Sequence, residues 1–225
     1  MPVALLRRAG AAGVALLLGL GGYELWYWTH GLDPGVETYL FKQGTSLRGV
    51  AQELRRRGVI AEPVSFVWGA TLMGQSRQLK AGEYRFATGA SAASILEQVV
   101  VGRVVEYPVR FVEGWTFHQM IAALDEAPKL TRTLSGLPAR EIMMRLGYPN
   151  MHPEGRFYPD TYNYSAGQQD HAILAKAFEK MRERLAREWE RREAGLPLAS
   201  PDEALILASI VEKETGRADE RPLIA

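Results

Sequence analysis

The amino-acid sequence predicts an α+β fold, and two observations support this prediction. The first is a pattern that occurs three times, in which a short strand ends at a Phe-x-x-Gly-x-Ser/Thr turn and a helix follows; the copies begin at Phe41, Phe86 and Phe111. The second is an amphipathic run over residues 170–192, where apolar side chains recur every three or four positions. Short strands combined with helices in small units are typical of the α+β class.

Each copy of the repeated pattern carries its own start signal for a helix. Ser46, Ser91 and Thr116 stand two residues after the turn glycine, where a side-chain oxygen can cap the N-terminus of the next helix. Between the first two copies, we expect a second helix over residues 62–74 and a returning strand within residues 79–86. An alternative stays open, because any strand, turn and helix could produce this pattern without a true repeat.

Composition excludes several classes of protein. The chain has 225 residues, a formal net charge of +1 and no cysteine. A nucleic-acid partner is therefore not expected, and disulfides, thiolate metal sites and a cysteine nucleophile are excluded. The sequence contains no H-E-x-x-H, Walker, G-x-G-x-x-G or G-x-S-x-G motif. We expect no metal and no cofactor, and the carboxylates remain as candidates for chemistry.

The N-terminal segment has the pattern of a membrane anchor. Arg7 and Arg8 precede an uncharged apolar run, and a Tyr/Trp cluster follows Glu24. Residues 9–28 supply the roughly 20 residues that cross a bilayer. Paired arginines favour a cytoplasmic N-terminus, and the aromatic cluster is typical of the opposite interface. The alternatives are a cleaved signal peptide, although no small-x-small cleavage site follows the run, and a buried soluble helix.

The segment "ALILASIVEKETG", residues 204–216, has well-defined signals for a helix. Ser200 can act as the N-cap, Pro201 suits the first turn, Glu203 completes a capping box, and Gly216 can close the end. The first eight residues of the segment are almost all apolar or alanine, on every side of a helical wheel. We therefore predict a buried helix.

This predicted helix ends in two carboxylates, Glu212 and Glu214. Burying an uncompensated charge is costly, so a buried carboxyl group can remain protonated, as a general acid requires. Glu212 shares a helix face with Leu205 and Ser209, whereas Glu214 points about 200° away. Glu212 is thus the better candidate for the acid. The alternative is that both glutamates are exposed at a frayed helix end and pair with Lys213 or Arg217.

The segment "HPEGRFYPDTYNY", residues 152–164, is a second candidate for a site. Its polar residues include Glu154 and Asp160, and its aromatic residues are Phe157, Tyr158, Tyr162 and Tyr164. Flat aromatic faces beside fixed polar groups suit a carbohydrate, because a sugar ring has an apolar face and a polar rim. A turn with tyrosines packed into a core would explain the same residues equally well.

The run "LASIVEKETG", preceded about fifty residues earlier by "PEGRFYPDTY", closely resembles the endolytic murein transglycosylase (MltG, YceG-like) family. The resemblance implies an N-terminal transmembrane helix, then a small LysM-like module with a connecting strand–helix unit over residues 36–105. Part of a mixed α+β catalytic domain is implied over residues 106–225. The chain ends at "RPLIA", where the family's catalytic domain continues. We therefore expect a member that is truncated at its C-terminus, and the activity of the truncated chain is left open.

In that family, the glutamate that matches Glu212 is catalytic, and the substrate is the glycan strand of peptidoglycan. The resemblance implies a lyase that cuts nascent strands between MurNAc and GlcNAc and leaves 1,6-anhydro-MurNAc ends. One carboxylate can act as acid and then as base, because the MurNAc 6-hydroxyl is the nucleophile. Expected substrate-binding residues are Glu154, Tyr158, Asp160, Ser209 and Glu214.

The resemblance also implies where the protein works. Residues 1–8 would be a cytoplasmic tail, residues 9–28 a single-pass anchor in the cytoplasmic (inner) membrane, and residues 29–35 a linker to a periplasmic bulk. Expected partners are peptidoglycan strands, the membrane and, as further candidates, cell-wall synthases. The alternative is a non-catalytic peptidoglycan-binding or scaffold module of the cell-wall synthesis machinery, in which Glu212 is inert.

Overall fold

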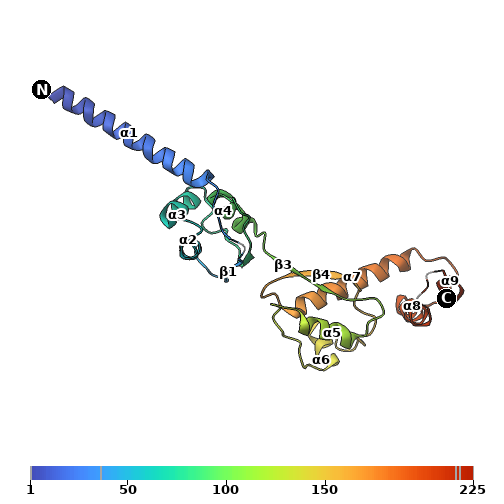
Figure 1. Cartoon of the computed structure of the whole chain (residues 1–225). Coiled ribbons are helices and arrows are strands. Elements are labelled where there is room, and N and C mark those ends of the chain that lie inside the picture. The colour runs from blue at the N-terminus through green and yellow to red at the C-terminus, as the bar shows by residue number, and fades with distance from the viewer. Residues whose placement is uncertain (1, 36, 216, 218, 225) are drawn as a thin grey trace. The chain divides into compact units, whose positions relative to one another are not determined.

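The computed structural model describes the backbone of residues 2–35, 37–215, 217 and 219–224, with side chains except those of residues 2–15 and 223. The chain divides into two compact units, Met1–Val105 and Glu106–Ala225. In each unit, the described residues form helices and a two-stranded antiparallel sheet (Figure 1). The predicted α+β class is confirmed.

The first unit is built around a strand–helix–helix–strand arrangement, as the sequence predicts. β1 (Tyr39–Phe41) is followed by α2 (Leu47–Arg56) and α3 (Pro63–Leu72), and β2 (Gly82–Tyr84) then returns to pair with β1. α4 (Ala92–Val101) completes the unit. Its core holds fully buried apolar side chains, among them Leu54, Phe66, Tyr84, Ile95 and Leu96.

The repeated turn has the same local structure in all three copies. Ser46, Ser91 and Thr116 are N-caps, and each side-chain oxygen accepts the backbone N–H three residues on, at 3.2–3.3 Å. The turn glycines have φ between 75° and 82°, the left-handed region that favours glycine. Each copy begins with a buried phenylalanine. The predicted caps are confirmed, because capping depends on residues that are close in sequence.

Helix α1 (Pro2–Thr29) is joined to the first unit by its last turns. Tyr27 is 4% exposed, and its hydroxyl donates to the carbonyl of Glu62 at 2.7 Å. The ring of Trp28 stacks on Phe66, with centroids 5.7 Å apart. The prediction that the Tyr/Trp cluster forms an interfacial belt is wrong for Tyr27 and Trp28, because α3 offers them an apolar protein surface.

The predicted transmembrane anchor over residues 9–28 has no support in the structure. Among the residues whose side chains are described, which begin at Leu16 in α1, no helix has the length and hydropathy of a membrane span. The side chains of Arg7 and Arg8 lie outside the described residues. So does Gly216, which the sequence suggests as the end of a later helix.

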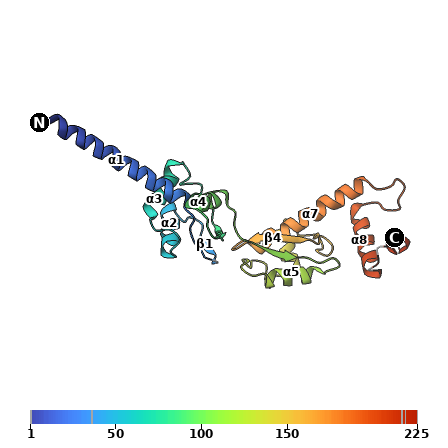
Figure 2. The ribbon, with the colours of Figure 1, turned by 45° about the horizontal axis from the view of Figure 1, so that its top comes forward.

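The second unit contains one antiparallel ribbon and the remaining helices. Its elements are β3 (Glu106–Arg110), α5 (Phe117–Glu126), α6 (Ala139–Arg145), β4 (Thr161–Ser165), α7 (Asp170–Glu190), α8 (Pro201–Glu214) and α9 (Arg221–Ile224). α5 contacts β3, and α7 contacts β4; Figure 2 shows both helices beside the ribbon. The predicted amphipathic helix is confirmed as α7, which buries Leu174 and Phe178 in the core of this unit.

Candidate active site

Glu154 is bound to the first turn of α5. Its Oε2 accepts the backbone N–H of Phe117 at 2.9 Å, and Thr116 caps the same turn. The first N–H groups of a helix lack intrahelical partners, and the helix dipole favours a negative charge there. Glu154 is nevertheless exposed. The carboxylate is therefore held in place and remains within reach of a ligand.

A cavity of about 610 Å³ lies beside Glu154. Apolar side chains of α5 and α6 line it, including Phe117, Ile121 and Ile142, and its exposed polar residues are His118, Arg140, Asn150 and His152. This volume is within the roughly 300–1,000 Å³ typical of ligand sites. Sequence reasoning missed these polar residues, because neither histidine belongs to a recognisable motif. The signal that could have indicated the two histidines is their position along the chain: His118 follows Phe117, and His152 lies two residues before Glu154.

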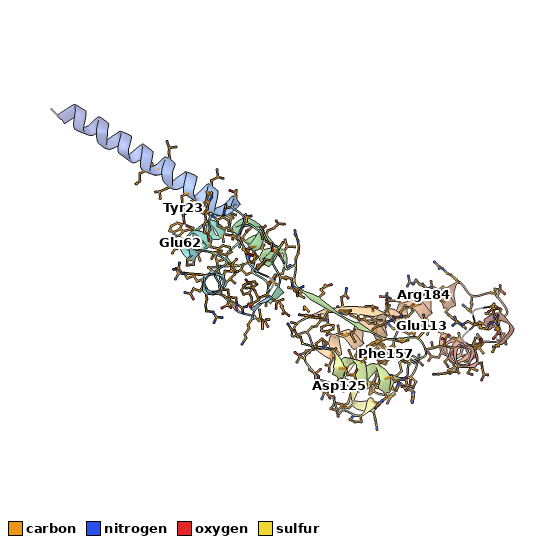
Figure 3. The ribbon with its side chains drawn as sticks, in the orientation of Figure 1. Tyr23, Glu62, Glu113, Asp125, Phe157 and Arg184 are labelled. Carbon is orange, nitrogen blue, oxygen red and sulfur yellow. The ribbon has the colours of Figure 1, made fainter. Side chains whose placement is uncertain are left out.

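Three of the four aromatic residues in the 152–164 segment belong to the core. Phe157, Tyr162 and Tyr164 are buried, and Figure 3 labels Phe157 within the second unit. Burial holds the pKa of Tyr162 above its ordinary range, and its hydroxyl donates to the carbonyl of Tyr158 at 2.7 Å. For these three residues the packing interpretation is confirmed, and the carbohydrate-cleft interpretation is wrong.

Tyr158 and Asp160 are half-buried and lie beside α7. The Lys180 ammonium forms an ion pair with Asp160 and lies 5.2 Å from the centroid of the Tyr158 ring. The hydrogen bond from Lys180, followed by that from the Thr161 backbone, lowers the pKa of Asp160. Among the described residues, no hydrogen bond or ion pair links Tyr158 or Asp160 to the carboxylates of the other predicted site residues.

We expect Asp160→Asn to weaken the dependence of folding stability on acidic pH. The pKa of this carboxyl is lower in the folded protein than the about 3.9 of an unfolded chain, so the stabilisation is present above that pH and is lost as the pH falls. The pair with Lys180 is partly exposed, so the effect should be under about 1 kcal/mol. Thermal denaturation from about pH 7 to pH 3 measures it, and parallel curves for both proteins would contradict the assignment.

Helix α8 begins as the sequence predicts, but it is not buried. Ser200 accepts the N–H of Glu203, and Pro201 occupies the first turn. Val211 is buried, whereas Ile206 and Ile210 are 59% and 50% exposed. The predicted buried helix is therefore wrong: α8 packs mainly on α7 and α9 among the described elements, and much of its apolar surface stays uncovered.

The two glutamates of α8 have different surroundings. Glu212 Oε2 forms an ion pair with Arg221 Nη2 at 2.8 Å, and the Glu212 side chain is 35% exposed. Ser209 is exposed and donates its hydroxyl to the carbonyl of Ile206 at 2.7 Å. Glu214 is exposed and lies about 200° from Glu212 around the helix. Glu212 is thus a half-exposed, paired carboxylate, and the predicted buried position at the end of a buried helix is wrong.

Two polar contacts hold α8 against the loops around Glu154. At the start of the helix, Arg156 Nη1 lies 2.5 Å from Asp202 Oδ1, and this hydrogen bond lowers the pKa of Asp202. At the end of the helix, Lys213 Nζ donates to the carbonyl of Gly114 at 2.9 Å. Gly114 belongs to the same turn whose helix binds Glu154. Gly114 and Phe117, three residues apart, therefore contact Lys213 of α8 and Glu154, respectively.

The face of α8 turned to these loops includes Glu212. Leu205 lies 3.8 Å from the position that a Cβ would occupy at Gly155. Leu205, Ser209 and Glu212 are spaced by four and three residues, so they share one side of the helix. The structure thus brings the loop of Glu154 and the Glu212 face of α8 into contact, although the two segments are far apart in the sequence.

The YceG-like family model matches residues 40–225 of this chain. A search of the curated proteins found no match. Among solved structures, a YceG-like protein from Listeria monocytogenes is similar: identity is 20%, the TM-score is 0.40, and the match covers 82% of this chain. The chain spans 66% of that protein, slightly under two thirds. Since the family model covers most of the sequence, the chain belongs to the YceG-like family.

Proposed function

We propose that this protein is an endolytic lytic transglycosylase, a carbon–oxygen lyase that cuts nascent peptidoglycan strands between MurNAc and GlcNAc. Membership of the YceG-like family associates the chain, at the level of the family, with lytic transglycosylases and the cell wall. The observation that carries the proposal is the contact between the Glu154 loop and the face of α8 that bears Glu212. Glu154 lines the cavity, which has apolar and polar lining residues, and Glu212 lies on the helix face that contacts the Glu154 loop.

Glu212 is the acid and the base of the proposed reaction. In its protonated form it donates a proton to the glycosidic oxygen, and the bond from that oxygen to C1 of MurNAc breaks. The resulting carboxylate then accepts the proton of the MurNAc 6-hydroxyl as O6 bonds to C1. The products are a 1,6-anhydro-MurNAc end and a free 4-hydroxyl on GlcNAc, and no water is consumed. One carboxylate is enough because the substrate supplies its own nucleophile.

Glu154 positions the sugar in this proposal. Its carboxylate is anchored by the N–H of Phe117, which fixes its orientation toward a hydroxyl or amide group of the glycan. The neighbouring cavity can receive one sugar unit with its substituents. Ser209, one turn before Glu212, and Glu214, at the helix end, are proposed as further substrate contacts. Tyr158 and Asp160 are proposed to flank the strand from the α7 side.

We also propose that α1 anchors the protein in the cytoplasmic membrane, with its bulk on the periplasmic side. Paired arginines before an apolar run and the exposed Trp26 after it favour this orientation. An anchored enzyme meets glycan strands where they are made. Its partners are then peptidoglycan strands, the membrane and the cell-wall synthases.

Glu154→Ala is expected to lower the rate of anhydro-product formation about tenfold, because it removes the carboxylate that orients the substrate. Glu154→Gln keeps an oxygen that can accept the N–H of Phe117, so it should preserve the start of α5 and lose less activity. Release of anhydro-muropeptides from purified sacculi measures both variants. A full rate for Glu154→Ala would remove this residue from the proposed site.

The ion pair between Glu212 and Arg221 favours a second candidate, a peptidoglycan-binding protein that does not cut, because this pair occupies the proposed catalytic carboxylate. Muropeptide analysis distinguishes the two functions: new anhydro ends in sacculi treated with the protein support the enzyme. Retention on sacculi without any new anhydro ends would support binding alone.

A further inference from the structure

The outer face of α3 is apolar and exposed. Val64, Trp68 and Leu72 follow one another at intervals of four residues, so they form one stripe along the helix. Trp68 is 65% exposed and Leu72 is 80% exposed, and Met73 at the end of α3 is also exposed. The sequence has no charged residue from 63 to 76. We call Val64, Trp68, Leu72 and Met73 the α3 stripe.

The neighbouring helix α2 shows how a water-facing helix of this unit is built. Its buried side is apolar, with Val50 and Leu54, and its exposed residues are polar or charged: Arg48, Gln52, Arg55 and Arg56. A surface helix normally carries charges on the side opposite the core, and a helix that is apolar all round is normally covered. α3 therefore has the composition of a helix that is covered on its outer face as well as on the face that packs in the core.

α3 is fixed to α1 along the edge of this stripe. The Ser65 hydroxyl donates to Glu24 of α1 at 2.8 Å, and Figure 3 labels Tyr23 and Glu62 where the two helices meet. Trp28 packs so closely that a Cβ on Gly69 would lie 2.0 Å from its ring. Ser65 lies only about 20° from Leu72 around α3, since they are seven residues apart. The stripe thus borders the contact with α1.

The exposed side chains of α1 continue the apolar surface. Leu16, Leu17, Leu18 and Leu20 are all more than half exposed, as is Trp26. Leu17 and Leu20 lie on the side of α1 that carries Glu24, because they precede it by seven and four residues. An apolar surface therefore runs from α1 onto the α3 stripe, and the contacts of Ser65 and Gly69 hold the two helices together.

We infer that the α3 stripe binds the surface of the lipid bilayer, with Trp68 in the interfacial region and Leu72 in the acyl chains. This inference rests on the proposed anchoring of α1 in the membrane. The reason to choose lipid is continuity, since the surface next to the stripe belongs to the helix proposed to enter the bilayer. Tryptophan at an interface and leucine below it are typical of such surfaces. The first unit would then be held against the membrane through α3 as well as through α1.

The test uses the full chain in vesicles of phosphatidylethanolamine and phosphatidylglycerol, with or without brominated acyl chains. The fluorescence of Trp68 is obtained as the difference between the wild type and Trp68→Phe, and that of Trp26 and Trp189 likewise. Trp68 should lose about half or more of its emission to bromine and be shielded from aqueous iodide, as expected for an interfacial side chain. Trp189, in the second unit, is the control and should respond to iodide alone.

Three other quenching results would contradict the inference, each for a different reason. If bromine quenches Trp26 but leaves Trp68 unquenched and open to iodide, α1 is anchored and the inference about α3 is wrong. Shielding of Trp68 from iodide without bromine quenching would show that protein, such as a second copy of the chain, covers the stripe, and it also overturns the inference. Failure of both Trp26 and Trp68 to respond to bromine would reject the proposed anchor and, with it, this inference.

Discussion

Glu212→Gln should lower the formation of 1,6-anhydro muropeptides by about 10² or more, the contribution typical of acid–base catalysis. The amide has the shape of the carboxyl group but can neither give nor take the proton. The substitution also removes the ion pair with Arg221, which is partly exposed, so the loss of stability should stay under about 1 kcal/mol. Chromatography of the products from sacculi measures the activity of the complete protein.

Glu214→Gln is the matched control for this prediction. It makes the same chemical change two residues away, at an exposed position on the other side of α8. We expect a clearly smaller loss of activity than in Glu212→Gln, because Glu214 is proposed to contact the substrate and not to transfer the proton. Full activity in Glu212→Gln with loss in Glu214→Gln would exchange the two roles. Full activity in both variants would reject the proposed mechanism.

Asp170→Ala should destabilise the second unit by about 3 kcal/mol or more. Asp170 is 1% exposed, and its Oδ2 accepts the backbone N–H groups of Thr133 and Leu134 at 2.8 and 3.0 Å. Its Oδ1 accepts the N–H of His171 at 2.7 Å in the first turn of α7. The substitution leaves donors without a partner inside the protein, and each such group costs about 1–3 kcal/mol. Urea unfolding followed by circular dichroism measures the loss.

Two variants sharpen this test. Asp170→Asn keeps one oxygen acceptor in the same place, so it should lose clearly less stability than the alanine variant. Asp219→Ala removes a carboxylate whose pair with Arg217 is exposed, and it should leave the stability almost unchanged. Equal, small losses in all three variants would mean that Asp170 does not hold the 131–134 segment to α7.

The features predicted correctly from sequence depend on residues that are close along the chain. Ser46, Ser91, Thr116 and Ser200 cap helices because the N–H that each accepts is three residues away. The period of apolar residues in α7 likewise predicts which side is buried, at Leu174 and Phe178. The family resemblance directed attention to Glu212 and Glu154 through their local motifs, although the roles of both remain predictions.

Other features depend on which elements meet in space, and local sequence does not contain that information. The apolar composition of α8 predicts burial, yet burial requires a covering element, and Ile206 and Ile210 remain exposed among the described residues.

Tyrosine is a residue type expected at a membrane interface, but Tyr27 packs against α3. The partner of Glu212, Arg221, and the contact of Lys213 with Gly114 follow from the packing of α8 on α9 and on the turn before α5. Capping and periodicity act within a few residues, whereas burial and ion pairing depend on the neighbours that the tertiary fold supplies.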